Sequence, residues 1–147
     1  MTNSFGEFAD AKLFLCIGTN MTEAHPVAST FLKNALRKGA KLIVVDPRRQ
    51  PLAKLADIYC QIKVGSDIAF LNGLMNVIIN EGLYDKDFVE NRCDNFEAFK
   101  AKIMEYPPER AAEISGVDVE TIRKVAHMLA TVKPAMLCYT LGITEHT

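Results

Sequence analysis

The stretch Lys41–Arg49 (KLIVVDPRR) constrains the fold more than any other part of the chain. Its apolar residues run from Leu42 to Val45 without polar alternation, and most of them are β-branched. This pattern indicates a strand buried on both faces, as in a parallel sheet covered by helices. Pro47 then prevents the ladder or a helix from continuing. Asp46 and two arginines therefore stand at the carboxyl end of an interior strand, where ligands bind in open α/β sheets.

Similar patterns along the chain predict alternating strands and helices. We expect buried strands at 13–18, 41–46, 58–63 and 135–140, helices at 26–38, 51–56, 67–81, 85–91, 95–105 and 118–131, and one helical turn at 109–114. Residues 1–12 lack a clear period. The order strand–turn–helix–strand over 13–46 has the size of one βαβ unit. The sequence thus predicts an α/β fold, a three-layer Rossmann-like domain with a mainly parallel sheet flanked by helices, and a single domain over 1–147.

The bulk properties exclude several classes of protein. The 147 residues carry a formal net charge of −1, which argues against a nucleic-acid-binding surface or a basic membrane anchor. No apolar run is long enough to cross a bilayer, and no signal peptide is visible, so we expect a cytoplasmic location. The cysteines are Cys16, Cys60, Cys93 and Cys138. They show no CxxC spacing, so we expect no metal site, and three of them lie in predicted strands as small buried side chains.

Polar residues of ligand-binding type follow three of the predicted strands. The first group is Gly18, Asn20, Thr22 and Glu23, the second is Asp46 and Arg48, and the third is Gly65 and Asp67. Because parallel neighbours end at the same edge of a sheet, we expect the three groups to lie together. The first group opens a helix whose N–H groups suit a phosphate. The acidic residue of the second suits ribose hydroxyls, and its arginine suits a phosphate or a base.

The residues alone leave two interpretations of these groups open. The GxGxxG motif is absent, so a standard NAD site is not expected. Either the strand ends bind another nucleotide-like ligand, or their Gly, Asp and Asn residues only make turns and caps. No catalytic constellation of Ser, His, Asp or Cys is visible. His25 precedes a helix start, and its role there is either capping or packing, or contact with a cofactor. His127 is expected to be solvated or to cap a helix, and His146 cannot be assigned a role.

Ordered motifs add a family resemblance to this pattern. The segments IGTNMTEAHPV, GAKLIVVDPRR and GSDIAFLNG, followed by YPPERAAEISGVDVETIRKVAHMLA and LGITEHT, resemble the molybdopterin oxidoreductase family. Within that family they are most similar to the catalytic α subunits of formate dehydrogenases, and the resemblance covers essentially the whole chain. It implies an internal α/β domain, a fragment of a larger multidomain subunit, that holds a guanosine-diphosphate arm of bis-molybdopterin guanine dinucleotide.

The resemblance also implies residue roles. Asn20, Thr22 and Glu23 match the first cofactor-contacting loop, which Gly18 begins; Asp46 and Arg48 match the second, and Gly65 and Asp67 the third. The family's amino-terminal 4Fe-4S cysteines, its cysteine or selenocysteine ligand to molybdenum or tungsten, and its catalytic histidine and arginine have no match here. We therefore expect no catalytic or metal-binding residue in this fragment, and no activity from it alone. The parent enzyme would oxidise formate and pass electrons to iron–sulfur subunits.

Other members of the family offer alternatives. The parent protein could instead be a cofactor-free scaffold subunit of a respiratory complex, or another oxidoreductase such as a nitrate reductase. A free-standing nucleotide-binding module is a third alternative. In the fragment interpretation the remaining domains of the same subunit are partners, and the surfaces that pack against them should expose apolar area.

Overall fold

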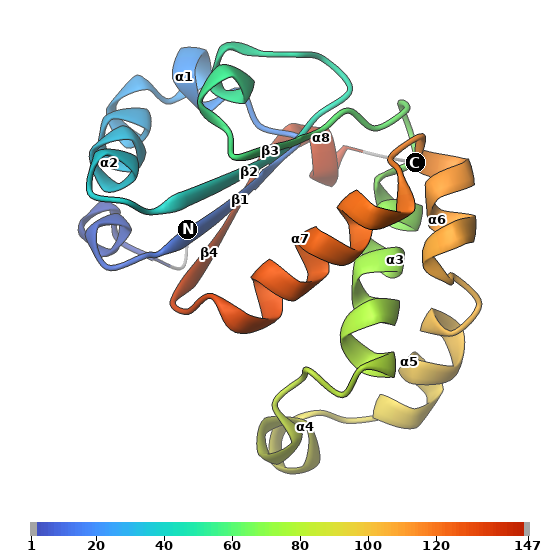
Figure 1. The fold of residues 1–147 in the computed structure, drawn as a ribbon. Coiled ribbons are helices and arrows are strands. Elements are labelled where there is room, and N and C mark those ends of the chain that lie inside the picture. Colours follow the sequence, from blue (N-terminus) through green and yellow to red (C-terminus); the bar gives the residue numbers. More distant parts are fainter. Residues whose placement is uncertain (1–2, 146–147) are drawn as a thin grey trace. The chain divides into compact units, whose positions relative to one another are not determined.

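The computed structural model describes residues 3–145, which alternate strands and helices and divide into two compact units. Unit 1 comprises Met1–Gln61 and Val132–Thr147, and unit 2 comprises Ile62–Thr131. Unit 1 contains η1 (Phe5–Ala9), β1 (Leu13–Ile17), α1 (Met21–Ala24), α2 (Pro26–Arg37), β2 (Lys41–Val45), η2 (Pro51–Leu55), β3 (Ile58–Cys60), β4 (Ala135–Tyr139) and α8 (Leu141–Thr144). Unit 2 contains α3 (Asp67–Asn80), α4 (Lys86–Arg92), α5 (Phe96–Ile103), α6 (Pro108–Ser115) and α7 (Val119–Thr131) (Figure 1). The expectation of a single domain stays a prediction.

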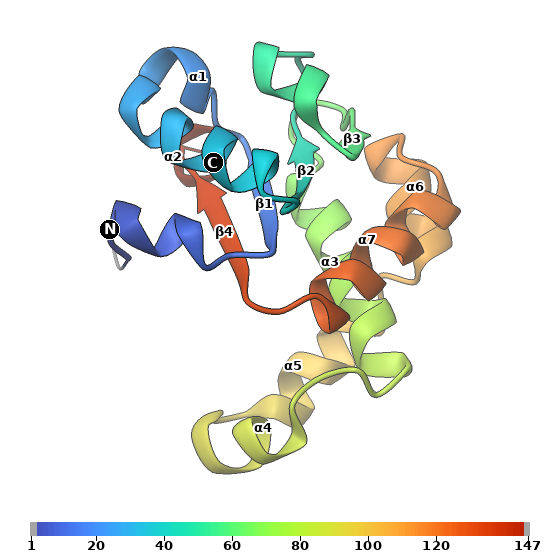
Figure 2. The same cartoon turned by 60° about the vertical axis from the view of Figure 1, so that its left-hand side comes forward.

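The strands of unit 1 form one parallel sheet with the order β3-β2-β1-β4. Figure 2 shows β4 at one edge of this sheet. All of β1 is buried, and so is β2 from Leu42 to Val45, because uninterrupted apolar runs leave no polar side chain to face water. The predicted α/β fold with a mainly parallel sheet is therefore confirmed.

One face of the sheet packs against η1 and α2. Phe8 from η1 and Leu32 from α2 belong to a core cluster with Phe14 of β1 and Val44 of β2. The ring centroids of Phe8 and Phe14 lie 5.5 Å apart. The sequence analysis missed η1, because this single 3₁₀ turn is too short to show a helical period. Its anchor is the pair Phe5 and Phe8, three residues apart on one side of the turn.

Asp57 completes the backbone pairing of β2 just before β3 begins. The Leu42 N–H donates to Asp57 Oδ2 at 2.9 Å, and the Asp57 N–H donates to the Leu42 carbonyl at 2.8 Å. The Lys41 ammonium lies 2.9 Å from Asp57 Oδ1. Partial burial works to raise the pKa of Asp57, but the hydrogen bonds from Leu42 and Lys41 outweigh it and hold that pKa below its ordinary value.

Unit 2 is built around α3, which packs against α5, α6 and α7. Gly73 brings α3 close to α6, since a Cβ at this position would lie only 2.4 Å from the Ala111 Cβ. Asn76, 2% exposed, donates to the Ile103 carbonyl at 3.0 Å. His127 on α7 places Nε2 2.9 Å from an Oε of Glu81 at the end of α3, so its visible role is a surface contact between helices.

The prediction of a buried strand at 135–140 is wrong. Residues of β4 alternate between exposed and half-buried, and Leu137 and Tyr139 are 57% and 54% exposed. Only Met136 and Cys138 pack against the core cluster formed with η1 and α2. An apolar run alone did not distinguish an edge strand from an interior one. Apolar side chains are thus exposed at this edge, and the expectation that such area packs against further domains stays a prediction.

Most other differences concern element ends. The third strand stops at Cys60 rather than 63, and α6 extends over Pro108–Ser115 rather than one turn. Two short helices, α1 and α8, were not predicted. No helix within residues 3–145 combines the length and the apolar character needed to span a membrane.

Candidate functional site

The loops that follow β1 and β2 lie side by side at the carboxyl edge of the sheet. The Gly18 N–H donates to the Val45 carbonyl at 3.0 Å. Gln50 is 2% exposed and donates through Nε2 to the Thr19 carbonyl. These contacts join the loop that carries the first predicted group to the loop that carries Asp46. The structure therefore brings the first and second groups together, and Gln50 is a positioning residue that the sequence analysis missed.

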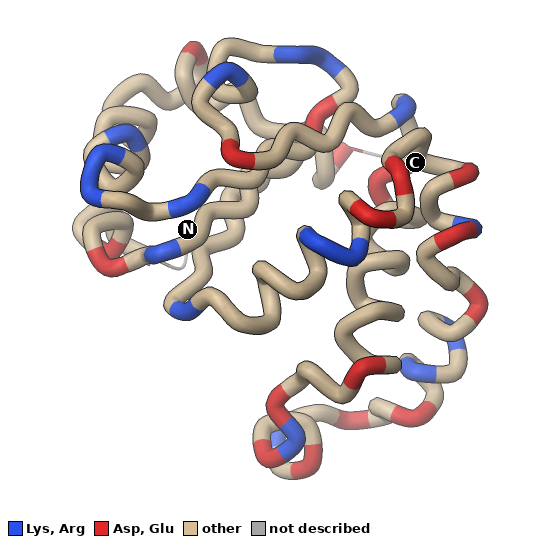
Figure 3. The backbone as a smooth tube through the Cα atoms, in the orientation of Figure 1, with Lys and Arg blue, Asp and Glu red and all other residues tan. Residues whose placement is uncertain are grey.

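The second loop holds Asp46 in a fixed orientation. Asp46 Oδ1 accepts a hydrogen bond from the Arg48 N–H at 2.8 Å, and the Tyr59 hydroxyl donates to the Asp46 carbonyl at 3.0 Å. The Arg49 guanidinium carbon lies 5.9 Å from the centre of the Tyr59 ring, whereas Arg48 is exposed. In Figure 3 this loop shows as a basic stretch. The loop thus carries a half-buried Asp46, whose carboxylate the Arg48 backbone orients, and an Arg48 side chain that is open to solvent.

The first group forms a small network of its own. Asn20 Oδ1 accepts from the Thr22 hydroxyl at 3.2 Å, and Asn20 Nδ2 donates to the Glu23 carboxylate. The group opens a helix as expected, but this helix is the single turn α1, which was not predicted, while α2 begins at Pro26 as predicted. The N–H groups of Glu23 and Ala24 donate to the Asn20 carbonyl. A phosphate would therefore gain little from helical N–H groups here.

Gly18 also contacts the backbone that follows β4. A Cβ on Gly18 would lie 2.7 Å from the Gly142 carbonyl carbon, and the Gly18 φ is +55°. The Gly142 N–H donates to the Gly18 carbonyl at 3.2 Å, and so does the Thr140 hydroxyl at 3.0 Å. Glycine is needed at position 18 for both its conformation and its close approach. The sequence analysis selected Gly18 but missed Thr140 and Gly142, although a glycine after a strand was a visible signal.

The third group lies in unit 2. Gly65 has a φ of +77°, and Asp67 is the first residue of α3 and is 6% exposed. Ser66 stands at the N-cap position of α3, but its hydroxyl donates to the Lys63 carbonyl at 2.6 Å rather than accepting from the helix. That the third group joins the first two stays a prediction.

The whole chain, residues 1–147, matches the family described as molybdopterin oxidoreductase. The chain belongs to the molybdopterin oxidoreductase family. Membership implies a pterin cofactor that carries molybdenum or tungsten. It also confirms the family resemblance found in the sequence motifs.

The relatives of this chain within the molybdopterin oxidoreductase family are named for different reactions. The chain is 50% identical over 136 residues to the acetylene hydratase of Syntrophotalea acetylenica, covering 91% of this chain and 18% of that protein. It is 44% identical over 147 residues to the F420-dependent formate dehydrogenase subunit alpha of Methanocaldococcus jannaschii, covering 100% of this chain and 22% of that protein. The solved structure of acetylene hydratase from Pelobacter acetylenicus matches with a TM-score of 0.86 and 47% identity, over 92% of this chain and 19% of that chain. The chain thus spans about a fifth of the length of these family members.

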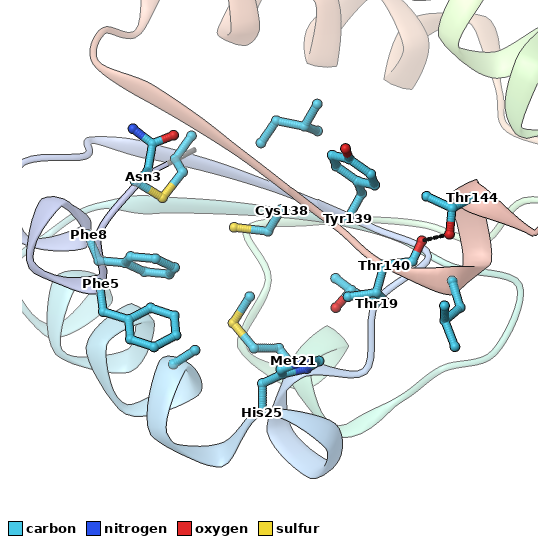
Figure 4. Close-up of a pocket in the computed structure, with 14 residues that line it drawn as sticks. Asn3, Phe5, Phe8, Thr19, Met21, His25, Cys138, Tyr139, Thr140 and Thr144 are labelled. Atoms are coloured by element: carbon cyan, nitrogen blue, oxygen red, sulfur yellow. Dashed lines mark hydrogen bonds between the residues drawn. The ribbon is translucent and has the colours of Figure 1, made fainter. Parts of the chain in front are cut away.

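A cavity of about 490 Å³ opens beside the first loop of this molybdopterin oxidoreductase domain (Figure 4). Its lining is mostly apolar and includes Phe5, Phe8, Met21, His25, Cys138 and Thr140. His25 is exposed and makes no side-chain cap to α2. The buried Thr19 hydroxyl also lines the cavity and has no hydrogen-bond partner among the described residues. The sequence analysis did not anticipate this cavity, because η1 and the edge position of β4 create it.

No metal centre is visible in the part of the chain that the structure describes. Among residues 3–145, no three His, Cys, Asp or Glu side chains gather where they could hold a metal ion. His146 lies outside the described residues.

Proposed function

We propose that this chain holds a guanosine-diphosphate arm of bis-molybdopterin guanine dinucleotide within a molybdenum- or tungsten-dependent formate dehydrogenase. The observation that carries the proposal is the joining of the Gly18 and Asp46 loops, through the Gly18–Val45 and Gln50–Thr19 hydrogen bonds, at the carboxyl edge of a parallel sheet. Ligands of open α/β sheets bind at this edge. The lone Gly18 in place of GxGxxG agrees with a ligand other than NAD.

The residues present fit a nucleotide diphosphate. Asp46 offers a half-buried carboxylate that can accept hydrogen bonds from ribose hydroxyls or from guanine N–H groups. The Arg48 N–H already orients this carboxylate, and the Tyr59 hydroxyl holds the Asp46 carbonyl. The exposed Arg48 guanidinium suits the diphosphate, because its planar donors pair with two phosphate oxygens at once. Fixed groups lose little entropy on binding, so this geometry favours affinity.

The remaining members of the groups have supporting roles in this proposal. Gly18 fixes the start of the first loop through its close contact with Gly142. Asn20, Thr22 and Glu23 present amide, hydroxyl and carboxylate groups to the ligand in this proposal. A role of Gly65 and Asp67 in binding the nucleotide stays a prediction from the family resemblance. When bound, the cofactor supplies the metal centre at which substrate reacts. The residues of this chain bind and orient it, and the 4Fe-4S cluster and the catalytic groups belong to other parts of the subunit.

Formate oxidation is the activity we propose for the parent protein, with electrons passing to iron–sulfur partner subunits. It is supported by the formate dehydrogenase α subunit that aligns over the complete chain at 44% identity. Hydration of acetylene is a second candidate, favoured by the 50% identity to acetylene hydratase. Formate-dependent dye reduction and acetylene consumption by the full-length protein would distinguish the two. Full-length protein without metal or pterin would instead support the scaffold alternative.

An NMR titration of the chain with GDP tests the binding role. We expect weak binding, because other domains supply the rest of the pocket, with amide shifts concentrated at residues 18–23 and 46–49. Asp46→Asn should weaken binding about 10- to 150-fold, since a hydrogen bond to a charged group contributes about 1.5–3 kcal/mol. Asp10→Asn makes the same chemical change at an exposed position of unit 1 and should leave affinity unchanged.

Shifts at Gly65 and Asp67 during the same titration would support the third group as part of the site. The binding role would be refuted if GDP shifted amides elsewhere only. Equal affinities of the wild-type chain and Asp46→Asn would refute the role of Asp46.

A further inference from the structure

Two cysteines face each other across neighbouring strands of the sheet. Cys16 on β1 and Cys138 on β4 are directly opposite in the parallel register. Both side chains belong to the face that packs against η1 and α2. Adjacent strands lie about 4.8 Å apart, and disulfides join residues whose Cα atoms are about 4.4–6.8 Å apart. The backbone spacing of this pair therefore suits a disulfide, although both thiols are free in this structure.

The two thiols are not equivalent. A hydrogen bond between the side chains raises the pKa of Cys16, burial raises it further, and the same hydrogen bond lowers the pKa of Cys138. These directions correspond to a Cys16 thiol that donates to the Cys138 sulfur and so stabilises a thiolate there. Thiolates rather than thiols are the nucleophiles in oxidation and exchange. Cys138 is thus the reactive member, and Cys16 is placed to attack it afterwards.

The solvent accessibility of the two cysteine side chains agrees with this order of reaction. Cys16 is fully buried, whereas Cys138 is half-buried and lines the 490 Å³ cavity. Figure 4 shows the Cys138 and Met21 side chains on the same side of β4, among the residues that line the cavity. A small oxidant in this cavity reaches Cys138 first.

We propose that Cys16 and Cys138 form a redox-active pair that closes to a disulfide when a peroxide enters the cavity. The Cys138 thiolate attacks one peroxide oxygen, the O–O bond breaks, and a sulfenic acid forms with loss of water. The Cys16 sulfur then attacks the Cys138 sulfur, and a second water leaves. Two thiols lose two electrons and two protons, and one hydrogen peroxide becomes two waters.

The disulfide would connect β1 and β4 close to a functional edge. Gly18 lies two residues after Cys16 and Thr140 two residues after Cys138, and the Thr140 hydroxyl donates to the Gly18 carbonyl at 3.0 Å. Drawing the two sulfurs to bonding distance changes the spacing of the strands just before this contact. Oxidation therefore acts on the loop that begins the first polar group.

Peptide mapping tests the pair directly, because trypsin places each cysteine on a separate peptide. Cleavage after lysine and arginine, but not before proline, gives 13–33, 55–63, 93–100 and 125–147. The chain is treated with one equivalent of hydrogen peroxide, and free thiols are then alkylated in denaturant. We expect a species that joins 13–33 to 125–147, lighter than their sum by two hydrogens, which dithiothreitol removes.

Cysteine-to-serine variants separate the oxidation of Cys138 from the closure of the disulfide. Cys138→Ser should abolish the linked species, and Cys16→Ser should leave a sulfenic acid on Cys138 that dimedone traps. Cys93→Ser removes an exposed cysteine and should leave the linkage unchanged. Complete alkylation of 13–33 and 125–147 after peroxide treatment of the wild-type chain, or linkage mainly through 93–100, would overturn the proposal without relying on any variant to fold.

Discussion

The contact between Gly18 and Gly142 makes a quantitative prediction about stability. In Gly18→Ala, the new methyl group meets the Gly142 carbonyl carbon at 2.7 Å, and the residue must also keep a φ of +55°. A left-handed conformation costs a non-glycine residue about 1–2 kcal/mol. Relieving an overpacked contact costs about a further 1–3 kcal/mol. We therefore expect Gly18→Ala to lower the free energy of unfolding by about 2–5 kcal/mol.

Two control variants separate these contributions. Gly82 has a similar φ of +65°, but a Cβ there meets nothing within 4 Å, so Gly82→Ala carries only the conformational cost of about 1–2 kcal/mol. Gly142 is outside the positive-φ region, and its Cβ would lie 2.7 Å from the Gly18 Cα, so Gly142→Ala carries only the steric cost. The effects of the two controls should sum approximately to that of Gly18→Ala.

Urea denaturation followed by far-ultraviolet circular dichroism gives the three free energies. The comparison holds only if the m-values of the variants match that of the wild type, since a changed m-value signals a changed unfolding transition. The reasoning would be refuted if Gly18→Ala were no more destabilising than Gly82→Ala. That result would mean that the ends of β1 and β4 do not approach closely.

Two further substitutions test contacts within single units. Gly73→Ala should destabilise by about 1–3 kcal/mol in urea, because its methyl group would lie 2.4 Å from the Ala111 Cβ, and Ala111→Gly should restore part of the loss. Asp57→Asn should cost about 0.5–1 kcal/mol at neutral pH, since it weakens the bonds to Lys41 and Leu42 at a partly exposed site. Because the pKa of Asp57 is lower in the folded state, this difference should persist above pH about 4 and disappear as the pH falls through the folded pKa. A difference that grew on acidification would contradict the assignment.

The fold was largely predictable because local patterns and tertiary structure agree. Uninterrupted apolar runs such as Leu42 to Val45 identified the interior strands, and helical spacing identified α2 and α3 within a few residues of their observed bounds. Edge position could not be predicted in the same way. The apolar run of β4 resembles that of β1, and only the strand order shows that β4 has a neighbouring strand on one side alone.

The candidate site was predictable where it follows directly from strand ends. Gly18 and Asp46 terminate adjacent parallel strands, so their proximity follows from topology. The contacts that fix the loops depend on distant segments and leave no periodic signal. Gln50 reaches back to Thr19, and Thr140 reaches across to Gly18 from the other end of the chain. Predicting such contacts requires knowledge of the register of the sheet, which sequence patterns do not give.

The relatives bear on why we propose a binding role for this chain. An acetylene hydratase and a formate dehydrogenase subunit, named for different reactions, match the chain at 50% and 44% identity. A segment that supplied the reacting groups would be expected to diverge between a hydration and an oxidation. What such enzymes can share is the orientation of a common cofactor, which needs rigid loops on a buried sheet rather than reactive side chains. The glycine contact between Gly18 and Gly142, and the buried Gln50 that joins two loops, provide that rigidity.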